Sequence, residues 1–294
     1  MKAALQTRPR AASAAADLAE LVKARLSLLT VATAMAGFAL GVKDSWDWLL
    51  LAATLGGTAL CAGGAAALNQ WWEREHDGLM KRTRERPLPS GRMTSSDALV
   101  AGSVLSVSGV LCLALFANPL SAALAAATII LYILIYTPLK RVTSLNTIIG
   151  AVPGALPPLI GWTAARGSIN AEGLTLFAIL FLWQMPHFLA IAWLYREDYA
   201  QAGFKMLSEG DESGAVTGRQ AVIYSLALLV VSLLPSVFFG YSAVYFYGAL
   251  ILGVGFTVLA GRFAARGTVP AARALFLGSI AYLPLLLGLM VLAR

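Results

Sequence analysis

Charged residues are scarce in this sequence, and the scarcity excludes most classes of protein. Only 13% of its 294 residues are charged, about half the share found in an ordinary soluble domain. A soluble protein of this length needs a charged surface that 22 basic and 15 acidic side chains cannot cover. Disorder is also excluded, because disordered chains have low hydrophobicity, whereas 59% of these residues are hydrophobic. The remaining class is an α-helical protein that crosses a membrane several times.

Cysteine is nearly absent as well. Cys61 and Cys112 each stand alone inside an apolar stretch. A disulfide framework or a thiolate metal site needs more thiols at closer spacing, so both are interpreted as small core residues. The net charge of +7 does not indicate nucleic acid, because the basic residues lie between apolar stretches rather than on one face. We therefore expect a lipid bilayer, and no nucleic acid, around the chain.

Long apolar stretches are what the sequence has in abundance. Most are long enough to cross a hydrocarbon core of about 30 Å. They predict nine membrane-spanning helices, at about residues 25–42, 48–68, 97–117, 119–137, 147–164, 172–195, 220–240, 243–262 and 271–292. We expect an all-α fold in which residues 25–294 form one intramembrane domain after an N-terminal segment, residues 1–24. Within that segment, residues 11–22 predict a short helix at the membrane surface and the first ten residues predict disorder.

The basic residues predict the orientation of these spans. With nine spans and a cytoplasmic N-terminus, all but three of the 22 basic residues lie on the cytoplasmic side. An excess of lysine and arginine marks cytoplasmic loops, so we predict this orientation in a bacterial inner membrane. Two long cytoplasmic loops, residues 69–96 and 196–219, carry most of the acidic residues. They predict that function lies at the cytoplasmic mouth.

The end of the second span carries a pattern suited to a metal ion. Continued as a helix at about 100° per residue, Asn69, Glu73 and Asp77 fall within an arc of about 80°. One face then presents an amide and two carboxylates, and Mg²⁺ typically bridges such carboxylates to the phosphates of a substrate. The alternative is a solvated helix end, with the carboxylates paired to Arg74 or Lys81.

Cations follow these carboxylates in two loops. Arg82 and Arg86 come directly after the triplet, and Lys140 and Arg141 lie in a second cytoplasmic loop. Arginine makes bidentate contacts to phosphate oxygens, so carboxylates with a metal on one side and cations on the other would hold a diphosphate. The alternative is attraction to anionic lipids of the inner leaflet, which explains the charge but not the neighbouring carboxylates.

The sixth span contains polar residues at membrane depth. Gln184 and His187 are expensive there and usually face a cavity, and Pro186 frees a carbonyl one turn earlier. His187 could ligate an iron, transfer a proton, or hydrogen-bond the carbonyl that the proline frees. After this span, Glu197 and Asp198 form a second carboxylate cluster that predicts a second metal contact.

Taken together, these motifs resemble the UbiA superfamily of intramembrane prenyltransferases over about residues 20–292. The matching positions are Asn69, Glu73 and Asp77, residues 82–88, residues 136–141, Asn146, Gly150, Gly154, residues 157–158, residues 161–162, residues 183–188 and residues 198–203. Many members have a second aspartate where this chain has Ala202. The branch that farnesylates haem b shares the alanine, so the chain is most similar to that branch.

The resemblance implies nine helices around a central cavity open to the cytoplasm. It implies farnesyl diphosphate and haem b as substrates, haem O as product, Mg²⁺ as cofactor, and haem A synthase as a candidate partner. The implied catalytic residues and Mg²⁺ ligands are Asn69, Glu73, Asp77 and Asp198. The implied substrate-binding residues are Arg82, Arg86, Tyr136, Lys140, Arg141, Trp183, Gln184, His187 and Tyr199.

Two alternative functions stay open at this point. A related enzyme could prenylate a quinone precursor, although the run from Trp183 to His187 and the alanine at position 202 argue against it. A transporter or cation channel could use the carboxylates as its binding site. A cation pathway would not, however, place Arg82 and Arg86 beside those carboxylates.

The charge asymmetry makes a prediction about topology. Single cysteines introduced between residues 82 and 94 are expected to react with a membrane-impermeant thiol reagent only in inverted vesicles. The parent chain, whose two cysteines lie in apolar stretches, serves as the control. Labelling in intact cells would reverse the orientation.

Overall fold

The computed structural model describes residues 13–43 and 45–293. Every regular element among these residues is a helix, which confirms the predicted all-α class. The elements are α1 (Ala14–Leu21), α2 (Ala24–Gly41), α3 (Trp48–Asp77), α4 (Ser95–Phe116), α5 (Pro119–Ile130), the π-helix η1 (Leu131–Tyr136), α6 (Thr137–Leu139), α7 (Asn146–Arg166), α8 (Ala171–Leu194), α9 (Arg196–Gln201), α10 (Ala215–Phe238), α11 (Ala243–Arg266) and α12 (Val269–Leu292).

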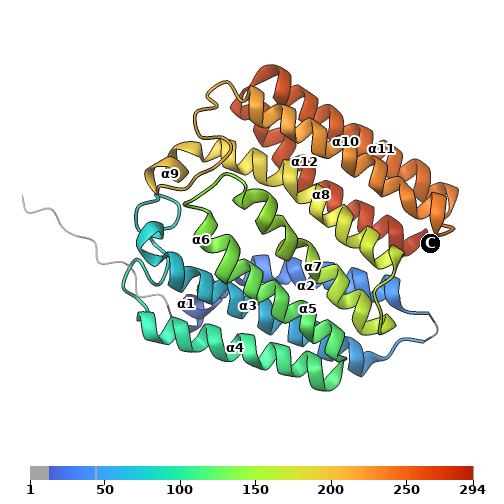
Figure 1. The fold of residues 1–294 in the computed structure, drawn as a ribbon, viewed down its shortest axis with the longest axis horizontal. Helices are drawn as coiled ribbons and strands as arrows, with labels where there is room; N and C mark the ends of the chain where they lie inside the picture. The colour runs from blue at the N-terminus through green and yellow to red at the C-terminus, as the bar shows by residue number, and fades with distance from the viewer. Residues whose placement is uncertain (1–12, 44, 294) are drawn as a thin grey trace, which may run out of the picture.

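Nine helices in the described part of the chain are long and apolar enough to cross a membrane, as predicted. Elements α5, η1 and α6 together form one of them, Pro119–Leu139. Figure 1 shows the long helices lying side by side. The short helix predicted near the N-terminus is α1, which begins at Ala14. Residues 11–12 and the predicted disorder of the first ten residues lie outside the described residues.

Capping side chains explain where several spans begin. Asp47, Thr94 and Asn170 each accept a hydrogen bond from the backbone N–H three residues on, at 2.9, 3.1 and 3.0 Å. Such contacts satisfy the free N–H groups of a first turn, so α4 begins at Ser95 rather than at residue 97. The largest difference is at the end of α3, which continues to Asp77, well past the apolar limit at residue 68.

Helix α7 lies at the centre and packs against α2, α5 and α8. In α7, 67% of the span is buried, compared with 22% in α4. The approach of α2 to α7 depends on glycine, because a Cβ atom at Gly161 would overlap the carbonyl oxygen of Ala34 and one at Gly37 would overlap that of Pro158. The small residues of α2 and α7 thus allow these two helices to pack closely.

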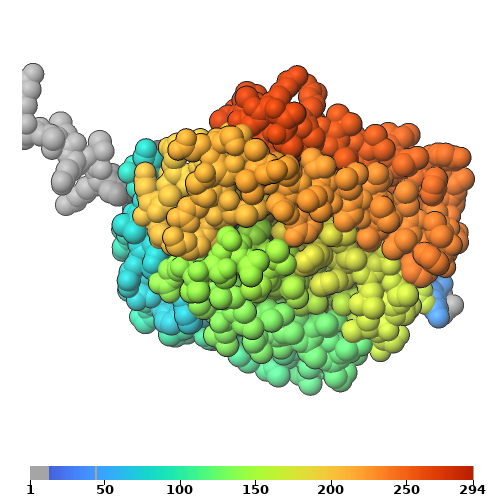
Figure 2. Space-filling model, turned by 45° about the horizontal axis from the view of Figure 1, so that its top comes forward, coloured from blue at the N-terminus to red at the C-terminus, as the bar shows by residue number. Residues whose placement is uncertain are grey.

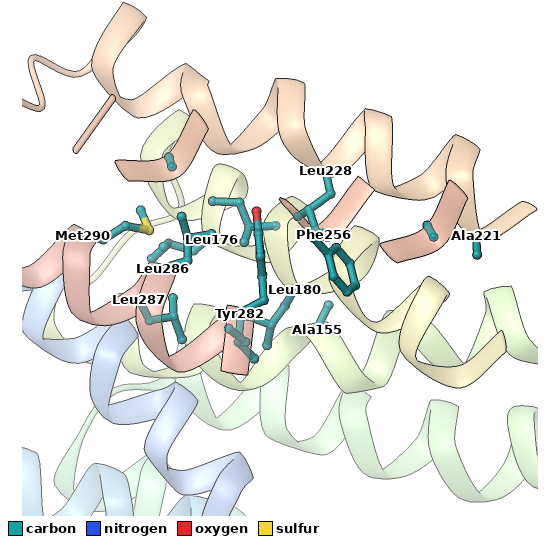
Figure 3. Packing of buried hydrophobic residues seen from close by; sticks show 14 of the residues in the cluster. Ala155, Leu176, Leu180, Ala221, Leu228, Phe256, Tyr282, Leu286, Leu287 and Met290 are labelled. Atoms are coloured by element: carbon teal, nitrogen blue, oxygen red, sulfur yellow. The ribbon is translucent and has the colours of Figure 1, made fainter. Parts of the chain in front are cut away.

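A large apolar core joins α8 to α10, α11 and α12. Figure 3 shows Leu228, Phe256 and Tyr282 gathered between these helices. The buried hydroxyl of Tyr282 lies 3.0 Å from Ser232 Oγ, and Tyr245 donates to the Ser232 carbonyl at 2.7 Å. The hydroxyls of these two tyrosines are thus hydrogen-bonded, which offsets the cost of burying them.

The long connecting segments gather at one end of the bundle, called the loop end here. It comprises α1, α6, α9 and residues 78–94, 140–145 and 202–214 (Figure 1). The segment after α3 and the segment after α8 are neighbours there (Figure 2), since Met80 packs against Ala202 and Phe204. Cys61 is buried, as predicted for a core residue, whereas Cys112 is only half-buried, and both are free thiols.

The close approach of α2 and α7 leads to a test of packing. Gly161→Val is expected to destabilise the protein by about 3 kcal/mol, because its side chain meets backbone that cannot move aside. Gly255→Val is the matched control, since no atom lies within 4 Å of a Cβ at that helical position. Thermal unfolding of both variants in one detergent measures the difference. Equal unfolding temperatures would contradict this packing.

Candidate active site

The predicted triplet lies on one buried face at the end of α3. Asn69, Glu73 and Asp77 are 1%, 6% and 1% exposed. The interpretation as a solvated helix end is therefore wrong, and Arg74 pairs with Glu75 instead, at 3.3 Å. Each member of the triplet meets a basic side chain from a different connecting segment.

Arg86 holds the last member of the triplet. Its Nη1 atom donates to Asp77 Oδ2 at 2.6 Å. The chain reaches this position because residues 78–94 fold back on α3, where Thr83 Oγ1 donates to the Asp77 carbonyl at 2.8 Å. The side chain of Arg86 is 19% exposed and that of Asp77 is 1% exposed. This ion pair is therefore largely removed from water.

Lys140 holds the middle member. Its Nζ atom lies 2.8 Å from Glu73 Oε1 and 3.1 Å from Oε2, and 4.7 Å from the centre of the Tyr136 ring. Burial alone would lower the pKa of Lys140, but the Glu73 carboxylate and then Tyr136 outweigh it, and the pKa is raised. The lysine is accordingly an ammonium ion.

The π-helix η1 places Tyr136 and Lys140 beside α3. Thr137 Oγ1 donates to the Tyr132 carbonyl five residues back, at 2.8 Å, and accepts from Asn69 Nδ2 at 3.2 Å. The Tyr136 ring lies directly on Gly150, where a Cβ would come within 2.5 Å of it. Local π-helix often marks functional sites, and here it sets the direction of the Tyr136 and Lys140 side chains.

Lys23 is a member of the site that the sequence analysis missed. It joins α1 to α2 in a left-handed conformation, with φ of 48°, and its Nζ atom donates to Asn69 Oδ1 at 2.9 Å. Burial, followed by the charges of Arg86 and Lys140, lowers the pKa of Lys23 to about 7. Its position at the start of the first span was the available signal, although a lysine there also fits the excess of basic residues on the cytoplasmic side.

Other predicted residues lie at the rim of this site. Arg82 donates to the Tyr199 hydroxyl at 3.4 Å, and its guanidinium lies over the Tyr195 ring, 5.4 Å from the centre. Arg141 is exposed and contacts His76 Nε2 at 3.3 Å. Arg82 therefore ties the first long loop to the segment after α8, whereas Arg141 faces outward.

The oxygen atoms of the triplet match the chemistry of Mg²⁺, which prefers carboxylate and amide oxygens and keeps several waters. Lys140 and Arg86 contact the same carboxylates, so a metal ion would share these oxygens with the two cations. Asp198 is half-buried on α9. Within the described residues, no three histidine, cysteine or acidic side chains are grouped closely enough to hold a metal ion, so Asp198 is not grouped with Glu73 and Asp77.

The polar residues of the sixth span point to two different helices. Gln184 is buried against α7 and donates to the Ala151 carbonyl at 2.7 Å. Trp183 Nε1 donates to the Ser279 carbonyl on α12 at 2.8 Å, and His187 Nδ1 lies 2.7 Å from Ser279 Oγ. The hypothesis that His187 bonds a carbonyl freed by Pro186 is wrong, because its partner is a hydroxyl 92 residues away in the chain.

Comparison with known proteins places this arrangement in a family. The UbiA prenyltransferase family matches residues 30–287. The chain is 46% identical to the protoheme IX farnesyltransferase of Solibacter usitatus, over 95% of this chain and 98% of that one. It is 44% identical to the protoheme IX farnesyltransferase of Opitutus terrae, over 99% and 98% of the two chains.

Solved structures share the fold at low sequence identity. A digeranylgeranylglyceryl phosphate synthase superposes with a TM-score of 0.79 at 16% identity, over 95% of this chain and 98% of that one. A UbiA homologue from Archaeoglobus fulgidus, bound to GPP and Mg²⁺, superposes with a TM-score of 0.68 at 13% identity, over 93% and 99%. This multi-pass membrane protein belongs to the UbiA prenyltransferase family.

Proposed function

We propose that this protein transfers the farnesyl group of farnesyl diphosphate to a vinyl group of haem b, with addition of water, to give haem O. The observation that carries the proposal is the buried face of Asn69, Glu73 and Asp77, on which Lys23, Lys140 and Arg86 converge. The names of the similar proteins from S. usitatus and O. terrae support haem as the acceptor.

The cations supply the diphosphate site. Arg86 and Lys140 already bind carboxylate oxygens at 2.6 and 2.8 Å, and phosphate oxygens accept the same kind of charge-assisted hydrogen bond. Arg82, at the rim beside Tyr199, is placed to guide the anion inward. These charges act most strongly as negative charge builds on the leaving oxygens.

The carboxylate face supplies the metal site. Asn69, Glu73 and Asp77 would hold Mg²⁺, which when bound neutralises charge on a diphosphate leaving group. We assign to Asp198, which lies apart from Glu73 and Asp77, a second metal contact from the segment after α8. Ala202 stands where the resemblance places a second aspartate in many members of the superfamily, and it is buried against Met80, so this position contributes no carboxylate.

The reaction has two bond changes before water enters. The bond between C1 of the farnesyl chain and oxygen breaks, and its electron pair leaves with the diphosphate. The electron pair of the haem vinyl group then bonds to C1, and water adds to the resulting carbocation with loss of a proton. The rings of Tyr136 and Phe204 lie 4.7 and 5.8 Å from the Lys140 ammonium, and such apolar walls keep bulk water from the allylic cation.

The membrane setting suits both substrates. A prenyl chain and a porphyrin are apolar bodies with anionic ends, so they enter from lipid while their anionic ends stay at the cationic loop end. We assign the protein to the bacterial inner membrane, with the loop end in the cytoplasm and haem A synthase as the recipient of the product. Direct pairing of cations with Glu73 and Asp77 disfavours a pathway for cations.

Asp77→Asn tests the carboxylate face. Membranes supplied with haem b, farnesyl diphosphate and Mg²⁺ are expected to form haem O, detected by mass spectrometry. The variant is expected to lose at least about 100-fold in turnover, since it removes a charge from the reacting centre. EDTA is expected to stop the parent protein and Mg²⁺ to restore it.

Glu75→Gln is the matched control for this experiment. Glu75 is two residues from Asp77 on the same helix, but its side chain is 78% exposed and pairs with Arg74. It is expected to keep the activity of the parent. Full activity of Asp77→Asn, or of metal-free membranes, would remove the basis of the proposed mechanism.

Arg82→Gln and Arg86→Gln separate diphosphate binding from attraction to lipid. Each is expected to raise the KM for farnesyl diphosphate by about 10- to 100-fold, the worth of one charge-assisted hydrogen bond, and to leave the KM for haem nearly unchanged. Lys205→Gln is the control, because this lysine is half-exposed and pairs with Glu209 at 3.2 Å. An equal loss for both substrates would favour the lipid interpretation.

A further inference from the structure

The hydrogen bonds around Ser279 determine where the proton of His187 lies. Ser279 Oγ is 2.5 Å from the carbonyl oxygen of Phe276. A carbonyl can only accept, so the single hydroxyl hydrogen must lie between these two oxygens. Ser279 Oγ is also 2.7 Å from His187 Nδ1, and the hydrogen of this second contact must come from the ring. His187 is therefore the tautomer that carries its hydrogen on Nδ1.

The other ring nitrogen, Nε2, then carries a lone pair. Among the described residues, no group hydrogen-bonds to His187 Nε2. The half-buried ring packs against aromatic side chains, with Trp183 stacked at 5.0 Å and Phe276 and Phe188 at 5.2 and 5.4 Å between ring centres. These neighbours offer no hydrogen to the lone pair, so it is available to an electron-pair acceptor.

This arrangement matches that of histidines that bind metals. Such histidines donate their second ring N–H to an oxygen, which fixes the tautomer and the ring orientation. Neutral imidazole is a common ligand of haem iron. Ser279 supplies the oxygen here, held in turn by the backbone of α12. His187 thus supplies a lone pair on Nε2, and Ser279 orients the ring that carries it, which are the two features of a histidine that ligates iron.

We infer that His187 Nε2 is an axial ligand of the iron of the acceptor haem, and that Ser279 is the residue that positions it. The inference rests on the proposed function. His187 lies eight residues before Tyr195, about 12 Å along α8 at 1.5 Å per residue, and Tyr195 lies under the Arg82 guanidinium. A haem ligated by His187 can thus direct its propionates towards the cations of the loop end.

Absorption spectroscopy of haem b titrated into the purified protein in lipid nanodiscs tests this ligand. His187→Gly is expected to lose the spectrum of histidine-ligated haem and to bind haem at least about 10-fold more weakly. Added imidazole is expected to restore the parent spectrum, because it can occupy the space of the missing ring. A side chain that merely joined α8 to α12 would not give this recovery.

His76→Gly is the matched control, since the chain has only two histidines and His76 lies at the loop end beside Arg141. It is expected to keep the parent haem spectrum. Ser279→Ala gives a second, milder test, with the ligated spectrum retained and haem binding about 10-fold weaker. Ser279→Thr, which keeps the hydroxyl, is expected to restore the affinity.

Two results would overturn the inference. One is a parent-like spectrum in His187→Gly saturated with haem, and the other is the absence of any effect of imidazole on a variant that has lost it. Either result, with haem O still formed by the parent protein, leaves the proposed function standing. A parent protein that forms no haem O and binds no haem would instead contradict the proposed function.

Discussion

Two buried ion pairs, Glu73 with Lys140 and Asp77 with Arg86, hold the loop end together. Removing one partner from such a pair costs about 3–5 kcal/mol, because the other charge is left in a medium of low dielectric. The carboxylates belong to α3, whereas the cations belong to two separate connecting segments. The pairs therefore order those segments against the bundle. The candidate site and the fold of this end are one set of interactions.

The same pairs explain how such a site could accept a diphosphate with its metal. A phosphate oxygen can accept from Arg86 and Lys140 the same charge-assisted hydrogen bonds that the carboxylates accept. A divalent cation can in turn neutralise Glu73 and Asp77 as Lys140 and Arg86 do. In the proposed reaction, Arg86 and Lys140 pair with the bound diphosphate, while Glu73 and Asp77 bind the metal ion. None of the four charges of these two ion pairs is left without a partner in either state, so substrate binding avoids the desolvation penalty of an unpaired ion.

Much of the fold could be predicted because the bilayer fixes the length of each span. The face that joins Asn69 to Asp77 was predictable because helical periodicity is local. The roles of Lys23 and Ser279 were not predictable, because they depend on contacts between residues far apart in the chain. Lys23 contacts Asn69, 46 residues away, and Ser279 contacts His187, 92 residues away. Gln184 was expected at a cavity, yet it packs on α7. The polarity of Gln184 predicts that burying it in the membrane costs free energy. It does not predict which neighbouring helix the side chain faces.

In the proposed reaction, the carboxylate face of α3 and the cations that pair with it form the diphosphate site. The most direct test is an experimental structure with Mg²⁺ and farnesyl thiodiphosphate, an analogue whose C1 bond is slow to break. The expected result is the metal ion on Glu73 and Asp77, with Lys140 and Arg86 bound to diphosphate oxygens. A diphosphate bound elsewhere, with both ion pairs at their distances of 2.8 and 2.6 Å, would contradict the claim.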